Sequence, residues 1–202
     1  MTPRSYFSWS SYNLFGQSPK KWKERYLLGE AGVMTPAMAF GKAFAEAREK
    51  GDSEGIEGLE LFLPVYPRRE VEMLATVKVD KKSVVLLGRI DGYDPKKHLI
   101  VDDKTGSVPW TQARVDSNEQ LTFYAFIYWV KKKRIPKLRL HWIEVELTAN
   151  KEGWRDIIRP TGRVETFETT RTVKDFVVLM NKIQKRYRGI ISLCESEWAK
   201  VV

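Results

Sequence analysis

The stretch from Glu70 to Gly106, EVEMLATVKVDKKSVVLLGRIDGYDPKKHLIVDDKTG, decides the fold, because short runs rich in Val, Leu and Ile alternate in it with turn residues. Residues 70–79, 83–93 and 98–104 have the length and composition of strands. The segments between them are rich in Asp, Lys and Pro, which is typical of turns. The stretch therefore predicts an antiparallel meander of three strands.

Helical patterns lie on both sides of this meander. Ser18-Pro19 is a helix-start signal that predicts a helix through residue 28, and a second helix is predicted from about Thr35 to Lys50. Downstream, the sequence predicts a buried helix over 117–133, a strand over 138–148, a further strand or hairpin within 154–169 and a long helix from Thr172. This order of elements predicts an α/β protein with a mixed central β-sheet flanked by helices. We expect a single domain over 1–202, with a helical portion over about 1–52, a core over about 53–150 and C-terminal strands and helix over about 151–202.

The composition excludes several classes of protein. Apolar residues make up 43% of the chain and charged residues 30%, a balance that excludes disorder along the whole chain. The single cysteine, Cys194, excludes a disulfide framework and any four-cysteine zinc or iron–sulfur site within the chain. The longest nearly apolar run, 121–130, is too short to span a bilayer, and residues 1–10 are unlike a signal peptide. A net charge of +9 favours a polyanionic partner, either nucleic acid or an anionic membrane surface.

An acidic residue and a lysine share one face of the third predicted strand. Asp102 and Lys104 are two residues apart, so their side chains lie on the same side of the strand, whereas Asp103 lies on the other. A lysine beside a carboxylate suits chemistry in which negative charge develops on a substrate. The alternative is structural, with all three residues ending a strand before the turn at Thr105 and Gly106.

Asp91 lies on the preceding strand and supplies a second carboxylate. If residues 95–96 form the hairpin tip, Asp91 is opposite Ile100 and diagonal to Asp102, a separation of roughly 7–8 Å. Two short carboxylates at that spacing suit Mg²⁺ or Mn²⁺. Together with the lysine they suit metal-assisted hydrolysis of a phosphodiester. The alternative reading makes Asp91 a turn residue.

These residues resemble the signature of the RecB-like branch of the PD-(D/E)XK nuclease superfamily. In that branch an isolated Asp precedes a D-x-K strand and a Q-x-x-x-Y helix, which match Asp91, Asp102-Asp103-Lys104 and Gln120-Leu-Thr-Phe-Tyr124. The start of the chain, Trp9-Ser-Ser-Tyr-Asn-Leu-Phe and then Ser18-Pro19-Lys-Lys-Trp, is similar to the start of many such nucleases. The resemblance covers about residues 9–130 and implies a PD-(D/E)XK restriction-endonuclease-like fold.

The resemblance implies a role for each matching residue. Asp91 and Asp102 would bind Mg²⁺ or Mn²⁺, and Lys104 would be the catalytic lysine. Gln120 and Tyr124 would face the site from the next helix and steady Lys104 or the DNA backbone. For Tyr124 the alternative is a core position, because it lies in a run of aromatic residues.

One feature of the family is absent. Many relatives have a histidine four residues after a glycine on the early helix as a further metal ligand, but here Gly41 is followed at that spacing by Ala45. Glu49, one helical turn beyond Ala45, or else Glu46 is our candidate for the missing ligand. Alternatively this helix face is solvated, with Glu46 pairing with Lys50, and the metal is held by the two aspartates, a backbone carbonyl and water.

Basic residues interleaved with aromatic residues suit a channel for single-stranded DNA or a frayed DNA end. The candidates for DNA contact lie in the first basic cluster and just after the D-x-K strand: Lys20, Lys21, Lys23, Trp110 and Arg114. The alternative is that these aromatic residues pack onto the core while the lysines are solvated. Glu70 and Glu72, at the start of the first strand, are assigned structural roles only.

The sequence therefore predicts a metal-dependent DNA nuclease, an exonuclease or DNA-end-processing enzyme of recombination or repair, of the kind that phages and mobile elements carry. We expect a cytoplasmic protein, in the host-cell cytoplasm if the chain is phage-encoded, that acts on single-stranded DNA or duplex ends and needs neither a membrane nor an iron–sulfur cluster. A homo-oligomer or a separate helicase or recombinase chain would be its partner, because the chain has no P-loop. Two alternatives stay open: a catalytically silent DNA-binding module that retains the nuclease fold, and a basic adaptor for protein or RNA.

Overall fold

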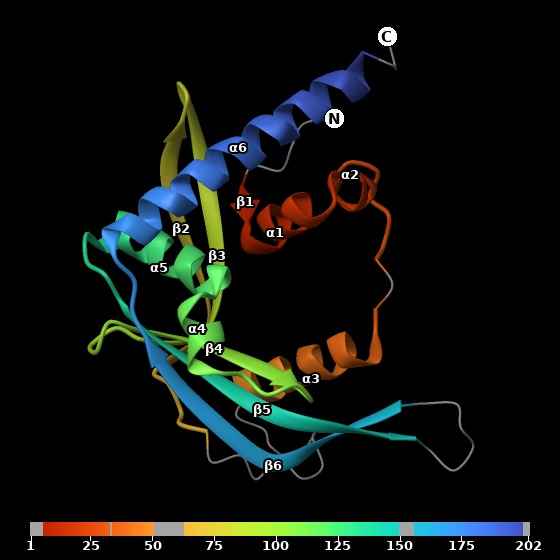
Figure 1. Ribbon diagram of the computed structural model, residues 1–202, viewed down its shortest axis with the longest axis vertical. Coiled ribbons are helices and arrows are strands. Elements are labelled where there is room, and N and C mark those ends of the chain that lie inside the picture. The colour runs from red at the N-terminus through yellow and green to blue at the C-terminus, as the bar shows by residue number, and fades with distance from the viewer. Residues whose placement is uncertain (1–5, 33, 51–62, 150–155, 200–202) are drawn as a thin grey trace.

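Figure 1 shows the computed structural model, which describes residues 6–32, 34–50, 63–149 and 156–199. The described elements are, in chain order, β1 (Phe7–Ser8), α1 (Trp9–Gln17), α2 (Pro19–Tyr26), α3 (Pro36–Lys50), β2 (Arg68–Val79), β3 (Lys82–Asp94), β4 (Leu99–Gly106), α4 (Gln112–Asp116), α5 (Glu119–Lys132), β5 (Lys137–Ala149), β6 (Asp156–Thr169) and α6 (Val173–Trp198). Within these residues, no helix has both the length and the apolar character needed to cross a membrane.

The strands form one mixed sheet of six strands. β2 and β3 make a long antiparallel hairpin, β3 and β4 are antiparallel, β4 and β5 are parallel, and β5 and β6 are antiparallel. The parallel step from β4 to β5 is bridged by α4 and α5, because a parallel pair needs a crossover connection. β1 and β4 pair with the same edge of β3 at different positions, β1 at Leu86 and Leu87 and β4 at residues 92–94.

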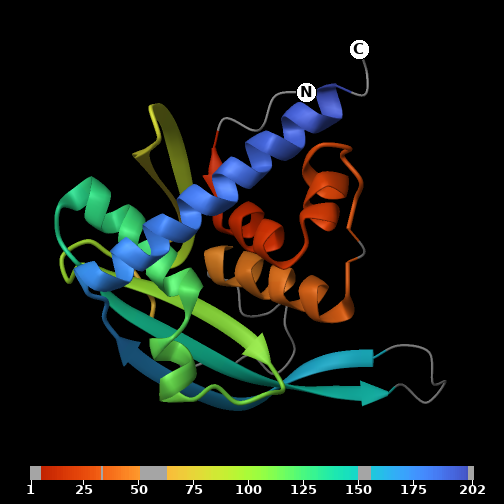
Figure 2. The same ribbon diagram turned by 45° about the horizontal axis from the view of Figure 1, so that its top comes forward.

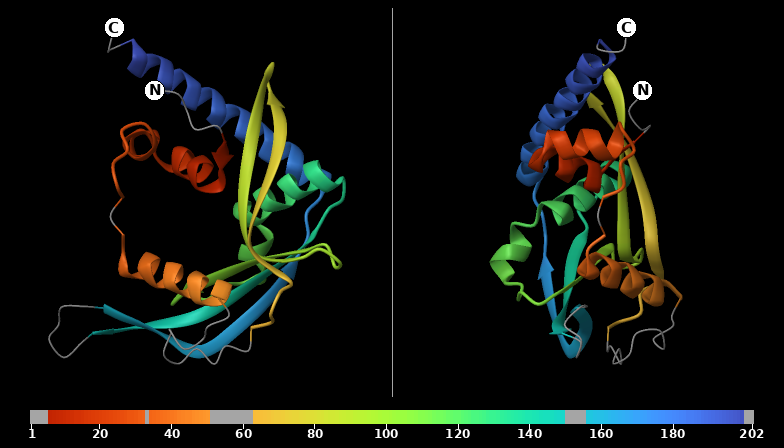
Figure 3. Two further views of the ribbon diagram at one scale, coloured as in Figure 1. Left: turned by 180° about the vertical axis from the view of Figure 1, so that it is seen from behind. Right: turned by 90° about the vertical axis from the view of Figure 1, so that its right-hand side faces the viewer.

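Helices cover both faces of this sheet. Trp142 and Ile143 are neighbours in β5, so their side chains lie on opposite faces. Trp142 belongs to the large core that contains the aromatic residues of α5 and the apolar residues of α6, whereas Ile143 packs with Phe44 of α3. α5 and α6 therefore cover one face and α3 covers the other (Figures 1 and 3). Figure 2 shows α1 and α2 beside the C-terminal half of α6, and α1 contacts both α6 and β3.

The α/β architecture with a mixed sheet flanked by helices confirms the prediction, and two local signals act as expected. The Ser18 side chain accepts a hydrogen bond from the backbone N–H of Lys21, with Pro19 in the first turn of α2. At α6, Thr172 and Asp175 form a reciprocal capping box, which satisfies backbone N–H groups that a helix start leaves without partners. The short helices α1 and α4 are not among the elements that the sequence predicts.

The turn between β3 and β4 is longer than predicted, and this changes the register. Residues 95–98 form the turn, with His98 in the left-handed region at φ 51° and the Asp94 carboxylate accepting hydrogen bonds from two backbone N–H groups of the turn. Tyr93 pairs with Ile100 as a result, so the prediction that Asp91 is opposite Ile100 is wrong by two positions.

Candidate active site

The site begins where β3 and β4 separate. The last paired residues are Gly92 and Val101, and the next residue on each strand is an aspartate, so Asp91 is level with Asp102. The side chain of Asp91 takes the place of the next backbone hydrogen bond between the two strands. Its Oδ2 accepts a hydrogen bond of 2.7 Å from the backbone N–H of Asp103. The separation of the strands thus opens a place for two adjacent carboxylates without leaving this N–H unpaired.

Asp102 and Lys104 share one face of β4, as the two-residue spacing predicts. The carboxylate of Asp102 is fully buried, and Lys104 Nζ lies 3.1 Å from its Oδ1 and 2.9 Å from its Oδ2. Both residues lie beside core positions of β5, Asp102 next to Leu140 and Lys104 next to Trp142, which places them on the face covered by α5. The side chain of Lys104 remains 29% exposed, so the lysine spans the distance from a buried carboxylate to solvent.

The electrostatics of the three groups are linked. Burial, followed by the negative charge of Asp102, raises the pKa of Asp91 well above its ordinary value, although Lys104 opposes the shift. Burial also works against the charge of Lys104, but the carboxylates of Asp102 and Asp91 outweigh it and raise the pKa of this ammonium. The site therefore holds two close acidic groups with one lysine whose raised pKa favours its protonated form, an arrangement that a further cation would stabilise.

A pocket of about 170 Å³ lies in front of this cluster. Asp91, Asp103 and Lys104 line it from β3 and β4, together with Arg69 and Glu70 of β2; the remaining lining residues are Gly41, Phe44 and Ala45 of α3 and Thr105 of β4. The pocket is small and charged, so it suits a phosphate group with a bound ion and water better than a large apolar ligand.

Glu70 is the site residue that sequence reasoning missed. The register of the β2–β3 hairpin runs from Arg69 paired with Gly92 to Val71 paired with Ile90, so Glu70 is level with Asp91. Its backbone is in the left-handed region, at φ 45°, which is uncommon for a residue with a side chain. No sequence signal identifies such a position, because glutamate does not favour it. Glu72, the other acidic residue left without a functional role, forms a surface ion pair of 2.8 Å with Arg89.

Gln120 and Tyr124 lie behind the carboxylates on α5. Gln120 Nε2 donates a hydrogen bond of 2.8 Å to the Tyr124 hydroxyl, which is the contact that the four-residue spacing of the pair produces. Tyr124 is only 4% exposed and belongs to the core. Burial, followed by the charge of Asp102, raises the pKa of its hydroxyl, so this core tyrosine is also close to the acidic site. Tyr124 is thus a core residue that lies near the acidic groups, and its role at the site stays a prediction.

The candidates for the missing metal ligand, Glu46 and Glu49, follow Ala45 on α3. Ala45 lines the pocket, and no donor atom comes from its side chain. Glu46 follows it by one residue, which turns it about 100° around the helix, and it is exposed in an ion pair with Lys42. The side chain of Lys50, its predicted partner, lies outside the part of the structure that is described. The side chain of Glu49 lies outside the part of the structure that is described.

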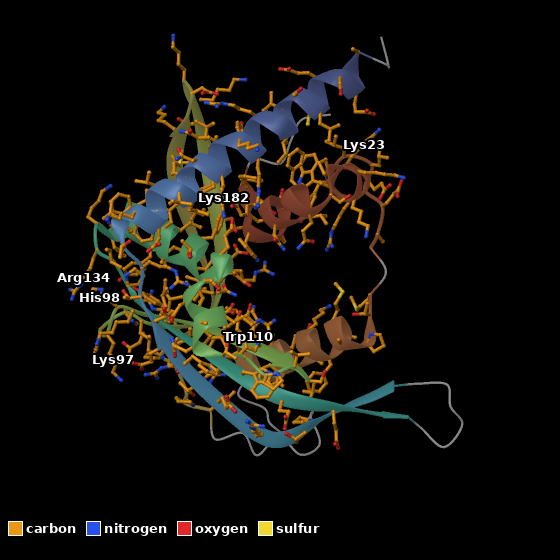
Figure 4. All side chains as sticks on the ribbon, in the orientation of Figure 1. Lys23, Lys97, His98, Trp110, Arg134 and Lys182 are labelled. Atoms are coloured by element: carbon orange, nitrogen blue, oxygen red, sulfur yellow. The ribbon has the colours of Figure 1, made fainter. Side chains whose placement is uncertain are left out.

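Neither histidine lies in the site. His141 is buried between Tyr66, at 2.7 Å, and Thr166, at 2.8 Å. His98 contacts the Tyr128 hydroxyl at 2.6 Å and Arg134 at 3.0 Å, and Figure 4 shows His98 and Arg134 side by side at the edge of the molecule. Among the described residues, no group of three or more His, Cys, Asp and Glu side chains is placed to hold a metal ion. The carboxylate oxygen atoms of Asp91 and Asp102 are the kind of ligand that Mg²⁺ and Mn²⁺ prefer.

The candidates for DNA contact fall into two separate groups. Lys20 and Lys21 are exposed on α2, and Lys23 forms an ion pair of 2.6 Å with Glu197 of α6. Trp110 and Arg114 lie near α4, where the Arg114 guanidinium stacks 3.9 Å from the centre of the Trp110 ring. Figure 4 shows Lys23 and Trp110 well apart, so the structure does not bring the two groups together.

The architecture is similar to that of solved structures. A crystal structure named "Putative exonuclease" from Eubacterium rectale is 15% identical, with a TM-score of 0.57, over 96% of this chain and 82% of that chain. The crystal structure of SSO0001 is 13% identical, with a TM-score of 0.55, over 93% of this chain and 78% of that chain. The chain has an exonuclease-like fold. At this identity the likeness concerns the fold alone, and it agrees with the fold that the sequence motifs predict.

A third structure, a phage related exonuclease from Haemophilus somnus 129PT, is 15% identical over 88% of this chain and 82% of that chain, with a TM-score of 0.47. No protein-family model matches the sequence. A search of curated proteins finds no match either.

Proposed function

We propose that this chain is a metal-dependent DNA nuclease that processes DNA ends as an exonuclease in recombination or repair. The observation that carries the proposal is the cluster of Asp91, Asp102 and Lys104, in which two carboxylates and an ammonium meet at the separation of β3 and β4 beside a small charged pocket. The exonuclease-like fold and the name of the Eubacterium rectale structure support the reaction class. The net charge of +9 supports a polyanionic substrate.

Asp91 and Asp102 would hold Mg²⁺ or Mn²⁺. Their fit to a hard cation follows from the raised pKa of Asp91, because burial and the neighbouring Asp102 both oppose its negative charge in the absence of a further cation. Glu70 lines the same pocket as Ala45 and is the candidate for a further oxygen donor. It would act through a bound water, because the described acidic side chains are not placed to hold a metal ion as a group of three. A divalent ion bound there supplies positive charge to the phosphate and lowers the pKa of a bound water.

Lys104 would stabilise negative charge on the phosphate rather than act as a base. Its raised pKa keeps the ammonium protonated at neutral pH, and the contact with both oxygens of Asp102 fixes its position at the pocket wall. A lysine that is held charged and only partly exposed is suited to stabilise charge that develops in a transition state.

Gln120 and Tyr124 would keep the acidic pair in place from behind. The raised pKa of Tyr124 keeps its phenol neutral, so the hydroxyl can donate a hydrogen bond while it accepts one from Gln120. We assign the wider DNA contacts to Lys20, Lys21, Trp110 and Arg114, which carry the exposed cations and the aromatic face, with Lys23 in a supporting position because of its ion pair with Glu197.

A catalytically silent DNA-binding module is the second candidate function. Ala45 favours it, since the α3 wall of the pocket has no side-chain donor at that position. The same fold and charge would then bind DNA without hydrolysing it.

Cleavage of end-labelled DNA distinguishes the two functions. Linear, circular, single-stranded and double-stranded substrates are incubated with Mg²⁺, Mn²⁺ or EDTA. We expect metal-dependent loss of linear but not circular DNA, abolished in Lys104→Ala and retained in Lys78→Ala, an exposed lysine on the β2–β3 hairpin. Salt-sensitive binding without cleavage of any substrate would instead identify the silent module.

A further inference from the structure

Two methionines on the α3 side of the pocket are exposed without a packing reason. Met34 is 59% exposed just before α3, and Met38 is 51% exposed in its first turn. α3 packs onto the sheet through other residues, since Phe40 and Phe44 form the cluster with Ile143. The two methionines therefore do not belong to the side of the helix that faces the core.

Met38 belongs to the helix face that borders the pocket. It precedes Ala45 by seven residues and Gly41 by three, spacings that place all three on one side of a helix. Gly41 and Ala45 line the pocket together with Asp91 and Lys104. With a rise of about 1.5 Å per residue, Met38 lies about 5 Å along the axis from Gly41 and about 10 Å from Ala45. A ligand that extends from the pocket along α3 thus meets Met38 next.

A nucleotide chain has the matching chemistry, because each phosphate is joined through a sugar to a flat apolar ring. The polarisable thioether of methionine makes favourable contacts with such rings. Gly41, the pocket residue nearer to Met38 along the helix, has no side chain, which leaves room for a strand to pass. Lys42 and Glu46 of α3 form an ion pair with each other.

We propose that Met38, with Met34 just before the helix, is a subsite for unstacked nucleobases of the strand whose phosphate occupies the pocket. The inference rests on the proposed nuclease function and makes it more specific. Bases inside a duplex are stacked on one another, so their faces are free only in a single strand or at a frayed end. The subsite would therefore make the protein selective for single-stranded ends.

A second copy of the chain is a less suitable occupant. A stable interface between proteins buries about 1,200–2,000 Å² in total, to which two methionine side chains contribute a small part. The ion pair of Lys42 and Glu46 on the same helix adds charge rather than further apolar surface.

The test is binding of labelled oligothymidylate in EDTA, where no metal-dependent hydrolysis occurs, compared with an abasic oligonucleotide of the same length. Met38→Gln keeps the length of the side chain and the helix propensity but removes the thioether. Its matched control is Val177→Gln, which changes an equally exposed apolar residue on α6. A contact between a thioether and a flat ring is weaker than stacking on an aromatic side chain, so we expect Met38→Gln to weaken binding of oligothymidylate about two- to tenfold. Binding of the abasic oligonucleotide, and binding by Val177→Gln, should stay at the wild-type level.

Equal losses on both oligonucleotides, or no loss on either, would overturn the inference, as would a change in oligomeric state in Met38→Gln. Cleavage by the wild type in Mn²⁺ is measured in parallel and reports on the nuclease function alone. A base-selective loss in Met38→Gln without any wild-type cleavage would support the subsite and contradict the nuclease. Cleavage without base-selective loss would support the nuclease and contradict the subsite.

Discussion

Gly88 of β3 is the position where one added methyl group should damage the packing behind the site. A Cβ built there would lie 3.1 Å from Tyr124 Cδ1 and 3.2 Å from Ile127 Cδ1. Carbon atoms pack best at about 3.5–4.0 Å, so the helix or the strand would have to give by a few tenths of an ångström. Both neighbours are buried, Tyr124 at 4% exposed and Ile127 at 0%, so neither can rotate into solvent.

Overpacking of this kind costs about 1–3 kcal/mol. For a chain of this length, each kcal/mol lowers the melting temperature by about 2–4 °C. We therefore expect Gly88→Ala to melt roughly 2–12 °C below the wild type, with the lower half of that range more consistent with a misfit of tenths of an ångström. Chemical unfolding in urea, followed by circular dichroism, measures the change in the free energy of unfolding.

The control is the same substitution at Gly41, which lines the pocket from α3. A Cβ at Gly41 would lie 3.6 Å from Thr105 Oγ1, an ordinary contact, and in a helix alanine is more stable than glycine by roughly 0.5–1 kcal/mol. Gly41→Ala should therefore stabilise the fold while Gly88→Ala destabilises it. Equal effects of the same sign would refute the packing argument.

The remaining predictions concern the acidic residues of the site. Burial, with the charge of Asp102, raises the pKa of Asp91 in the folded state, so its ionised form costs stability above the ordinary aspartate pKa of about 3.9. Asp91→Asn should raise the melting temperature of the metal-free protein at neutral pH, and the difference should vanish as the pH falls below about 4; an equal difference at both pH values would contradict the reasoning. Mn²⁺ at a hundred times its dissociation constant should stabilise the wild type by about 2.7 kcal/mol, measured as a shift in thermal unfolding, and Asp102→Asn should lose this shift. Glu70→Gly should relieve the strain of the left-handed backbone and stabilise the metal-free fold by about 1 kcal/mol, whereas Glu70→Gln should not. Both variants should reduce the shift in thermal unfolding that Mn²⁺ causes. A full shift in either variant would show that Glu70 does not bind the metal.

Much of the fold follows from local patterns in the sequence. The period of two places Asp102 and Lys104 on one face of β4, and the side chains of Ser18 and Thr172 cap the helices that they were expected to start. These features depend on a few neighbouring residues, so the sequence contains what is needed to predict them. The relation of Asp91 to Asp102 depends instead on the turn between their strands, where His98 adopts a left-handed conformation that its residue type does not demand.

On α3, residue spacing alone predicts which residues share a side of the helix, but it does not predict which side faces the sheet. The turn of about 100° per residue already separates Glu46 from Ala45, and the structure shows Glu46 exposed beside Lys42. The same rule places Met38 on the pocket side of α3, but the sequence alone does not show that the core-facing residues are Phe40 and Phe44. That distinction requires the sheet against which the helix packs.

Glu70 of β2 places a carboxylate in the pocket, where Ala45 of α3 has no side-chain donor. A left-handed backbone at a residue with a side chain costs of order 1–3 kcal/mol and persists only where the surroundings fix it. Here the surroundings do so on both sides, because Arg69 is paired with Gly92 and Val71 with Ile90 across the hairpin. The strain is therefore held by strand pairing that the fold needs in any case. It places a carboxylate level with Asp91 in a pocket whose helical wall, made of Gly41, Phe44 and Ala45, has no side-chain donor.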